Sequence, residues 1–341
     1  MKRVGTLTSF ARIIFLALVG LIPAGATENS SLLERPIPEG GGPTEVECVM
    51  GVLDIDDISE ADQNFTVNVI VRFSWHDPRL AHEGPGFLKK QFSEIWHPSL
   101  IFLNRQLIWA SMGKFALVSP EGEVTFRQQF WGDFSQPMDL HDFPFDEQTF
   151  GIQVVSTGSD EQMDIKLVKS TEVPSFVTEN YSVASWDVTG HGVDTSDYEI
   201  PGVGTFPSFH MSFTAKRYSH HYLIKVVAPL LLIVFLSQLV FWLSPTEGGS
   251  QLGVSVTSFL TVIAYHVALS SKLPEIPYLT NFDVFVFLCT ILVALAMIEV
   301  VITTGLAQRD KVDAARKMDR ICRVAFPGLT ILGTMYAFLW H

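Results

Sequence analysis

Residues 218–243 read YSHHYLIKVVAPLLLIVFLSQLVFWL, and this stretch divides the chain into two parts of different character. From Tyr222 to Leu243 only Lys225, Ser237 and Gln238 interrupt a continuous apolar run. A helix of about 20 apolar residues is long enough to cross a hydrocarbon layer of roughly 30 Å. The stretch therefore predicts a membrane-spanning helix. The chain as a whole, with 48% hydrophobic and 17% charged residues, has the composition of a membrane protein.

Three further apolar runs follow, at about Gln251–Leu269, Val284–Leu306 and Ile321–Trp340. Four spans return the chain to the side of the bilayer from which it entered. The connection between the last two runs, at about 307–320, is short and basic, with Arg309, Lys311, Arg316, Lys317 and Arg320. Because Lys and Arg collect on the cytoplasmic side, we predict a cytoplasmic connection with no room for an intracellular domain.

The N-terminus has the pattern of a secretory signal. Lys2 and Arg3 precede a short apolar core at 13–22, and small residues follow at 24–26. We therefore expect residues 1–26 to be a signal peptide, which places the next part of the chain in the extracellular or periplasmic space. A retained anchor is the alternative, although the apolar core is short for a span. Residues 27–45, rich in Gly, Pro and charge, are expected to be a flexible lead-in.

Residues 46–217 have the pattern of an antiparallel β-sandwich. Alternating apolar residues at 65–73 predict a half-buried strand. Clusters of Gly, Pro, Asp and Ser separate it from similar segments at 101–109, 114–118, 122–130, 148–155, 164–168, 181–188 and 206–215. Many short strands at this spacing are typical of a sandwich. Cys48 is the single cysteine of this part, so the sequence predicts neither an intrachain disulfide nor a zinc site here.

The two parts also differ in charge. Residues 27–217 contain 12 Lys/Arg and 29 Asp/Glu, whereas residues 218–341 contain 8 and 7. An acidic outer domain repels nucleic acid and attracts cations through its long-range field. We therefore expect no nucleic-acid partner. Solubility alone explains the acidity equally well.

The run at 251–269 is more polar than the other three. Its hydroxyl side chains suit a helix that faces water or protein on one side. At helical spacing one stripe contains Gly253, Thr257, Leu260, Ala264, Val267 and Ser271. A ring of such helices, which requires an oligomer, would form a polar filter below a hydrophobic constriction. Close helix packing through small residues explains the stripe equally well.

Several motifs of residues 46–341 occur in the order found in one known family. WHDPRL at 75–80 and IWHPSLIFLN at 95–104 lie in the β-rich part, and LPEIPY at 273–278 joins the second and third spans. The longest motif is PMDLHDFPFDEQTF at 137–150, and Arg217 precedes the first span. Together they resemble the pentameric ligand-gated ion channels, the Cys-loop receptor superfamily.

One departure within the resemblance is informative. Gln136 and Phe150 stand where the animal receptors carry their two bridged cysteines. The absence of this disulfide and the short cytoplasmic connection are typical of prokaryotic members.

The resemblance implies an extracellular β-sandwich at 46–217 above a four-helix transmembrane domain at 218–341. Five identical chains would surround a central pore in the plasma (inner) membrane. The protein would be a channel for inorganic ions and not an enzyme, opened by a small-molecule agonist. The second span would line the pore, with Leu260 in a central hydrophobic ring, Thr257 below it, and Gly253 and Ser250 toward the cytoplasmic mouth.

The resemblance also implies a gating junction between the sandwich and the helices. Its residues would be Phe143, Pro144, Phe145, Asp146, Arg217, Pro274, Pro277 and Tyr278. Asp146 and Arg217 are expected to form an ion pair, which a purely structural role explains as well.

The agonist would lie between neighbouring sandwiches. In relatives several aromatic rings cage a cationic amine, but the matching positions here supply Phe102, Arg72, Thr157, Tyr198 and Phe206. Arg72 would suit an anionic or zwitterionic ligand. Each of the aromatic residues is also explained by core or interface packing.

Glu247 precedes the second span, and five copies would form an acidic ring that favours cations. Anion-selective relatives have Pro-Ala-Arg where this chain has Gly249-Ser250-Gln251. We therefore predict cation selectivity, with an anion-selective channel as the alternative.

Protons and divalent cations are alternative stimuli. His220, His221 and His266 titrate near neutral pH, but histidines beside a membrane are also interfacial anchors. The acidic run at 54–62 offers carboxylates for calcium, yet its spacing fits no metal loop, so we interpret it as a solvated loop and predict no cofactor.

Other classes of protein lack support. The sequence contains no nucleophile elbow, phosphate-binding glycine loop or HExxH motif of an enzyme. It also shows no inverted repeat of a transporter.

Overall fold

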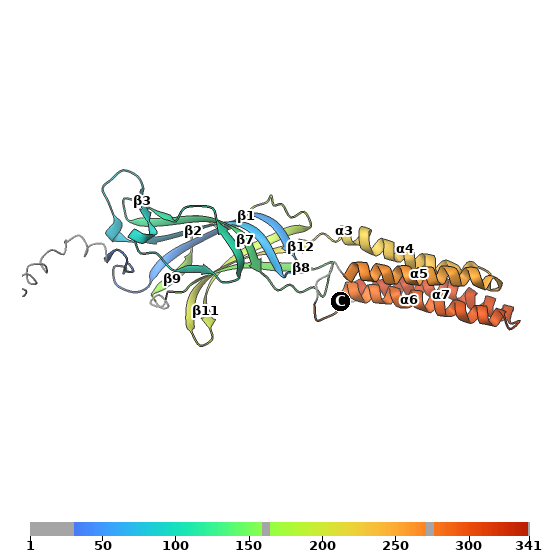
Figure 1. Cartoon of the computed structure of the whole chain (residues 1–341). Coiled ribbons are helices and arrows are strands. Elements are labelled where there is room, and N and C mark those ends of the chain that lie inside the picture. The colour runs from blue at the N-terminus through green and yellow to red at the C-terminus, as the bar shows by residue number, and fades with distance from the viewer. Residues whose placement is uncertain (1–30, 159–163, 271–275, 340–341) are drawn as a thin grey trace, which may run out of the picture.

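The computed structural model describes residues 31–158, 164–270 and 276–339. The chain forms two parts arranged end to end, a β-rich domain and a bundle of long helices (Figure 1). The predicted signal peptide at 1–26, Ser271 and Pro274 lie outside the described residues.

The β-rich domain is a sandwich of two sheets, as predicted. The larger sheet has the strand order β10-β1-β2-β7-β6-β3, with β5 paired to β7 and β9 paired to β1. Its strands are β1 (Thr44–Ser59), β2 (Asn64–His76), β3 (Leu88–Gln91), β5 (Arg105–Ala110), β6 (Phe115–Val118), β7 (Glu123–Ser135), β9 (Ile165–Lys169) and β10 (Phe176–Val177). The smaller sheet has the order β11-β12-β8-β4, formed by β11 (Trp186–Ile200), β12 (Gly204–Arg217), β8 (Glu147–Ser156) and β4 (Leu100–Phe102).

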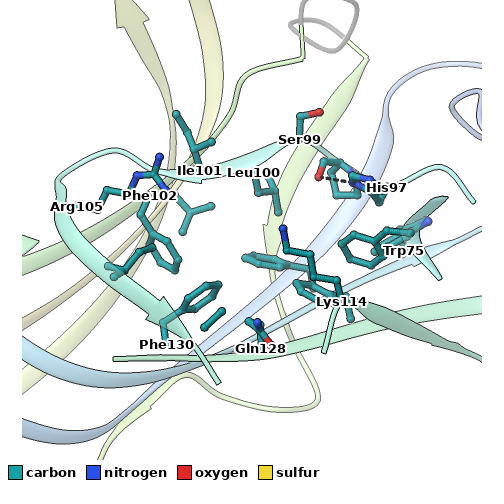
Figure 2. A pocket seen from close by; sticks show the side chains of 17 residues that line it. Trp75, His97, Ser99, Leu100, Ile101, Phe102, Arg105, Lys114, Gln128 and Phe130 are labelled. Carbon is teal, nitrogen blue, oxygen red and sulfur yellow. Dashed lines mark hydrogen bonds between the residues drawn. The ribbon is translucent and has the colours of Figure 1, made fainter. Parts of the chain in front are cut away.

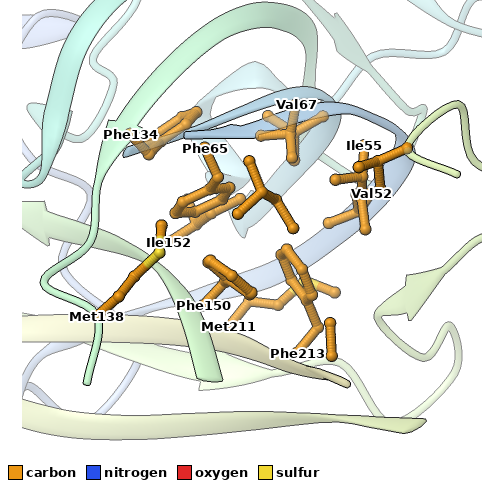
Figure 3. Packing of buried hydrophobic residues seen from close by; sticks show 14 of the residues in the cluster. Val52, Ile55, Phe65, Val67, Phe134, Met138, Phe150, Ile152, Met211 and Phe213 are labelled. Carbon is orange, nitrogen blue, oxygen red and sulfur yellow. The ribbon is translucent and has the colours of Figure 1, made fainter. Parts of the chain in front are cut away.

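The alternating pattern of β2 places its apolar side chains between the two sheets. Phe65 from β2 contacts Phe150 from β8 and Phe213 from β12, with ring centroids 5.2 and 5.6 Å apart (Figure 3). All three rings are 0–1% exposed. Beside this cluster, the Gly151 amide donates to the Gln136 side-chain oxygen at 3.1 Å. Core packing and this hydrogen bond therefore join the two ends of the 136–150 loop.

Two predicted segments of the sandwich need correction. The strand expected at 181–188 begins at Trp186 and continues to Ile200. Its second half is polar and has no apolar alternation, so the sequence did not predict it. Backbone hydrogen bonds to β12 hold this half in the sheet. Residues 31–43 are docked, and not a flexible lead-in. Arg79 donates to the Glu34 carbonyl at 2.8 Å, and the Trp96 amide donates to the Leu32 carbonyl at 2.6 Å.

Within residues 31–339, apart from the two undescribed gaps, four helical segments are long and apolar enough to cross a membrane. The first combines α3 (His220–Tyr222), a π-helical turn η3 (Leu223–Val227), α4 (Ala228–Gln238) and η4 (Leu239–Trp242). A short turn, η5 (Pro245–Glu247), leads into α5 (Gly248–Ser270). The other two are α6 (Asn281–Ala307) and α7 (Val312–Leu339), which pack against each other (Figure 1).

The connection expected at 307–320 is shorter than predicted. α6 ends at Ala307 and α7 begins at Val312, so only residues 308–311 connect them. Arg316, Lys317 and Arg320 therefore belong to the first turns of α7. An apolar run predicts only the lipid-facing part of a helix. The first turns of α7 are charged and precede that part, so the sequence placed the start of the helix too late.

Candidate functional site

Arg217, the last residue of β12, lies at the centre of the junction between the sandwich and the helices. Its side chain is 1% exposed. Nε donates to Asp146 Oδ1 at 2.7 Å and Nη2 donates to Asp146 Oδ2 at 3.1 Å. Two parallel charge-assisted hydrogen bonds fix the angle as well as the distance between the groups. The predicted ion pair is therefore formed, with bidentate geometry.

A second carboxylate, which the sequence did not indicate, completes this cluster. Arg217 Nη1 donates to Glu60 in the loop between β1 and β2. The solvated loop predicted at 54–62 is wrong for its first part, which belongs to β1, although Asp56, Asp57 and Asp62 are exposed. Asp54 and Asp56 lie within β1, where Asp54 accepts hydrogen bonds from Ser182 and Asp56 accepts one from Trp131.

Aromatic rings surround the guanidinium of Arg217. Its Cζ lies 4.1 Å from the ring centroid of Trp186 and 4.9 Å from that of Phe143. Ring faces attract cations, most strongly where water is excluded. Burial by itself would lower the pKa of Arg217, but the hydrogen bonds and charges of Asp146 and Glu60 raise it overall. Arg217 is therefore a permanent positive charge held between two carboxylates.

The loop at 137–146, which contains Asp146, contacts the helices directly. Tyr278, just before α6, accepts a hydrogen bond from the Leu140 amide at 3.0 Å and donates to the Met138 carbonyl at 3.3 Å. Its ring stacks on His141 with centroids 4.1 Å apart. The Asn281 amide at the start of α6 donates to the His141 carbonyl at 2.9 Å. The loop is thereby attached to the entrance of the third span.

Two phenylalanines of the same loop reach other spans. Phe143 is 4% exposed and packs edge-on against Tyr222 of the first span and Phe282 of the third, at 4.8 and 5.8 Å. Phe145 contacts Phe338 near the end of α7 at 5.6 Å. Between them, Pro144 is buried, whereas the predicted junction residue Pro277 is exposed.

The pore-facing stripe predicted on α5 is exposed in the single chain. The buried residues of this helix form one stripe, Gln251, Ser255, Ser258 and Val262, each 0–8% exposed. Each of these buried residues is followed two positions later by a residue of the predicted stripe. At 3.6 residues per turn, two positions correspond to about 200°, so the predicted stripe lies on the opposite face of the helix. Its residues here are Gly253, Thr257, Leu260 and Ala264. These four, with Ser250 and Val267, are exposed. The chain thus covers one face of α5 and leaves the predicted stripe open.

One hydrogen bond ties α5 to the first span. Tyr265 of α5 donates to the Val226 carbonyl in the π-helical turn η3 at 2.9 Å. Glu247, the predicted selectivity residue, is exposed at the other end of α5 in η5.

Two family models match the chain. The model of the neurotransmitter-gated ion-channel ligand binding domain matches residues 27–217, which is more than half of the chain. The model of the neurotransmitter-gated ion-channel transmembrane region matches residues 226–314. The chain belongs to the neurotransmitter-gated ion-channel family. It is therefore a ligand-gated ion channel and a multi-pass membrane protein, as predicted. It is not an enzyme, which was also predicted.

The sandwich of this channel contains a cavity of about 320 Å³, with mainly aromatic and aliphatic walls (Figure 2). Phe102 and Phe130 lie on one side of it, and Trp75 and His97 lie near its other end. Of the five ligand residues predicted from the sequence, only Phe102 lines this cavity.

The other four predicted ligand residues of the channel lie elsewhere. Arg72, on β2, donates to Glu47 at 3.2 Å and to Ser170 at 3.3 Å. Thr157 donates to the Ser99 carbonyl at 3.3 Å. Tyr198 and Phe206 are paired across the β11–β12 hairpin, where Phe206 is 4% exposed. A single chain therefore does not gather these residues into one site.

Sequence reasoning missed an exposed aromatic pair on the channel. Trp109 of β5 and Trp131 of β7 are 49% and 40% exposed, with ring centroids 5.0 Å apart. Trp109 ends the segment predicted at 101–109 and Trp131 directly follows the segment predicted at 122–130, so the sequence alone did not pair them. Among the described residues no group of three or more His, Cys, Asp or Glu side chains is placed to hold a metal ion.

Proposed function

We propose that five copies of this channel surround a cation-selective pore lined by α5, which opens when a small extracellular ligand binds between neighbouring sandwiches. The observation that carries the proposal is the open stripe of α5, opposite the stripe that the chain buries itself. An amphipathic helix whose second face contains hydroxyls, glycine and a few apolar residues needs either water or other copies of itself to cover that face.

Leu260 is the proposed gate. Its side chain is 62% exposed in the single chain, at the middle of the open stripe. Five such side chains would form a hydrophobic constriction that closes the pore by excluding water. Ala264 and Val267 continue the stripe toward the outer end of α5.

Thr257 supports cation selectivity. Its hydroxyl donates to the Gly253 carbonyl at 2.8 Å. A hydroxyl has one proton and two acceptor lone pairs, so this bond directs the proton to the helix and leaves the oxygen for a permeating ion. With Gly253 and Ser250 below it and Glu247 at the mouth, the proposed pathway presents oxygen atoms and negative charge.

Reversal potentials test this selectivity. Currents from the purified channel in liposomes are expected to reverse near the equilibrium potential of sodium or potassium under a salt gradient. Glu247→Gln is expected to weaken the preference for cations, whereas Asp310→Asn, an exposed carboxylate in the connection between α6 and α7, should leave it unchanged. A reversal potential that follows chloride would overturn the cation assignment.

The ligand is proposed to bind through an acidic group at Arg72. Arg72 lies directly opposite Arg127 in the pairing of β2 with β7. Like charges opposite each other in a sheet are destabilising, so an anionic group held between them would relieve the repulsion. Glu47 neutralises part of this charge, and the half-buried hairpin residue Tyr198 of a neighbouring chain would cover the ligand.

A ligand screen tests this second part. Amino acids and carboxylates are expected to evoke currents, and Arg72→Gln is expected to raise their half-maximal concentration at least tenfold. Lys216→Gln, an exposed basic residue elsewhere on the sandwich, is the control. Currents evoked by amines without an acidic group, and insensitive to Arg72→Gln, would contradict the assignment.

A further inference from the structure

Two carboxylates face each other inside the helical bundle, away from the pore stripe and from the junction. Glu299 of α6 is 4% exposed and Asp319 of α7 is 1% exposed. Within the described part of the chain, none of their four carboxylate oxygens has a hydrogen-bond donor. Glu299 lies eight residues before the end of α6 and Asp319 lies seven residues after the start of α7, so the packing of these two consecutive helices places the carboxyl groups at the same level of the bundle, beside each other.

The surroundings offer little to neutralise them. On α7, the Cys322 thiol beside Glu299 and the charge of Arg323 near Asp319 favour the ionised carboxylates. Arg323, however, uses Nε to donate to the Phe241 carbonyl at 2.8 Å, and its guanidinium lies 5.6 Å from the ring centroid of Trp242. The other basic groups near Asp319, Arg316 and Arg320, are exposed.

The remaining elements packed against α6 and α7 add no charge to the pair. The segments α4 and η4 contain no titratable side chain, and η5 contributes Glu247, which is exposed. The titratable residues of α5, Tyr265 and His266, lie at the opposite end of that helix.

Two buried carboxylates cannot both be ionised at this separation without a large cost. Like charges side by side disfavour the second ionisation, and each buried oxygen without a donor adds a desolvation penalty. One proton removes both problems, because it halves the charge and creates an O–H···O hydrogen bond between the groups. Ionisable residues inside a membrane domain are retained where they have a function.

We propose that Glu299 and Asp319 form a proton-binding site that holds one proton at neutral pH and thereby fastens α7 to α6. The pair lies about two turns from the ends of both helices at the 308–311 connection. The basic residues there place this end on the cytoplasmic side. A rise in cytoplasmic pH removes the proton, and the repulsion between two carboxylates then loosens the contact between α6 and α7.

Infrared spectroscopy of the purified full-length channel tests the shared proton directly and needs no agonist. At neutral pH the wild type is expected to show the C=O stretching band of a protonated carboxylic acid, which disappears at high pH. Glu299→Gln combined with Asp319→Asn should remove the band, whereas Asp313→Asn, an exposed carboxylate on the same helix, should leave it. A neutral-pH spectrum without this band would overturn the proposal.

Thermal unfolding at a series of pH values provides a second readout, in case the double variant folds poorly. The wild type is expected to lose thermal stability as the pH rises above neutral. Glu299→Gln alone supplies an amide donor in place of the proton, so its unfolding temperature should no longer fall over this range. The same fall in Glu299→Gln and in the wild type would show that the pair does not bind the proton.

Discussion

Arg217 and Asp146 are joined by two hydrogen bonds of 2.7 and 3.1 Å, and both side chains are almost completely buried. This pair connects the last residue of the sandwich to the loop that contacts three of the four spans. Glu60 binds the third nitrogen of the same guanidinium. A movement of the loop therefore moves Arg217, and Arg217 continues directly into the first span.

Loss of Arg217 should cost more than loss of either carboxylate. Arg217→Gln leaves the buried Asp146 and the partly exposed Glu60 without their cation, and removal of one partner from a buried ion pair typically costs about 3–5 kcal/mol. Asp146→Asn and Glu60→Gln each leave one carboxylate on the guanidinium, so their unfolding temperatures should fall less. Thermal unfolding of the three variants measures this order, and a smaller loss for Arg217→Gln would contradict it.

Leu260 and Val262 lie on opposite faces of α5 and should respond differently to polar substitution. Leu260→Ser would make the proposed constriction easier to wet, so it should lower the agonist concentration for half-maximal current or open the channel without agonist. Val262 is 0% exposed, and Val262→Ser should instead reduce stability and surface expression. If Leu260→Ser leaves gating unchanged, this residue does not form the gate.

Gly248 and Gly249 form a matched pair at the start of α5. A Cβ on Gly248 would overlap the Thr304 side chain of α6, whereas a Cβ on Gly249 would meet no atom within 4 Å. Gly248→Ala should therefore destabilise the channel by about 1–3 kcal/mol through overpacking, and Gly249→Ala should not. Thr304→Ala removes the overlapping methyl group and is expected to restore part of the loss in the double variant. Equal unfolding temperatures for the two glycine variants would refute the close contact.

Asp139 should contribute to the loss of thermal stability of the channel at acidic pH. The hydrogen bond from the His141 side chain is the main cause that lowers the pKa of Asp139 below its ordinary value. A carboxylate with a lowered pKa stabilises the folded state above the pKa of the unfolded chain, and the contribution is lost as the pH falls below about 4. In Asp139→Asn the unfolding temperature should therefore fall slightly less steeply with decreasing pH in this range. The difference is expected to be small, because the Asp139 carboxylate is largely exposed. An unchanged loss of thermal stability at acidic pH would exclude this contribution.

Much of the architecture was accessible from local patterns. Four apolar runs predicted the four spans, because length and hydrophobicity alone decide whether a helix suits a bilayer. Alternation in β2 predicted the faces of a half-buried strand. Motif order predicted the family and the Asp146–Arg217 pair. The roles of Leu260, Glu247 and Arg72 stay predictions.

Only the tertiary structure decided which charges are partners. Glu60 lies 157 positions before Arg217, and Glu299 lies on a different helix from Asp319. Neither pairing leaves a periodic signal in the sequence, since an acidic residue in a loop or a helix looks the same whether it is solvated or buried. The docking of residues 31–43 and the length of β11 likewise depend on partners distant in the chain. Local hydrophobicity therefore determined the elements of this channel, and the packing of distant segments determined where its buried charges meet.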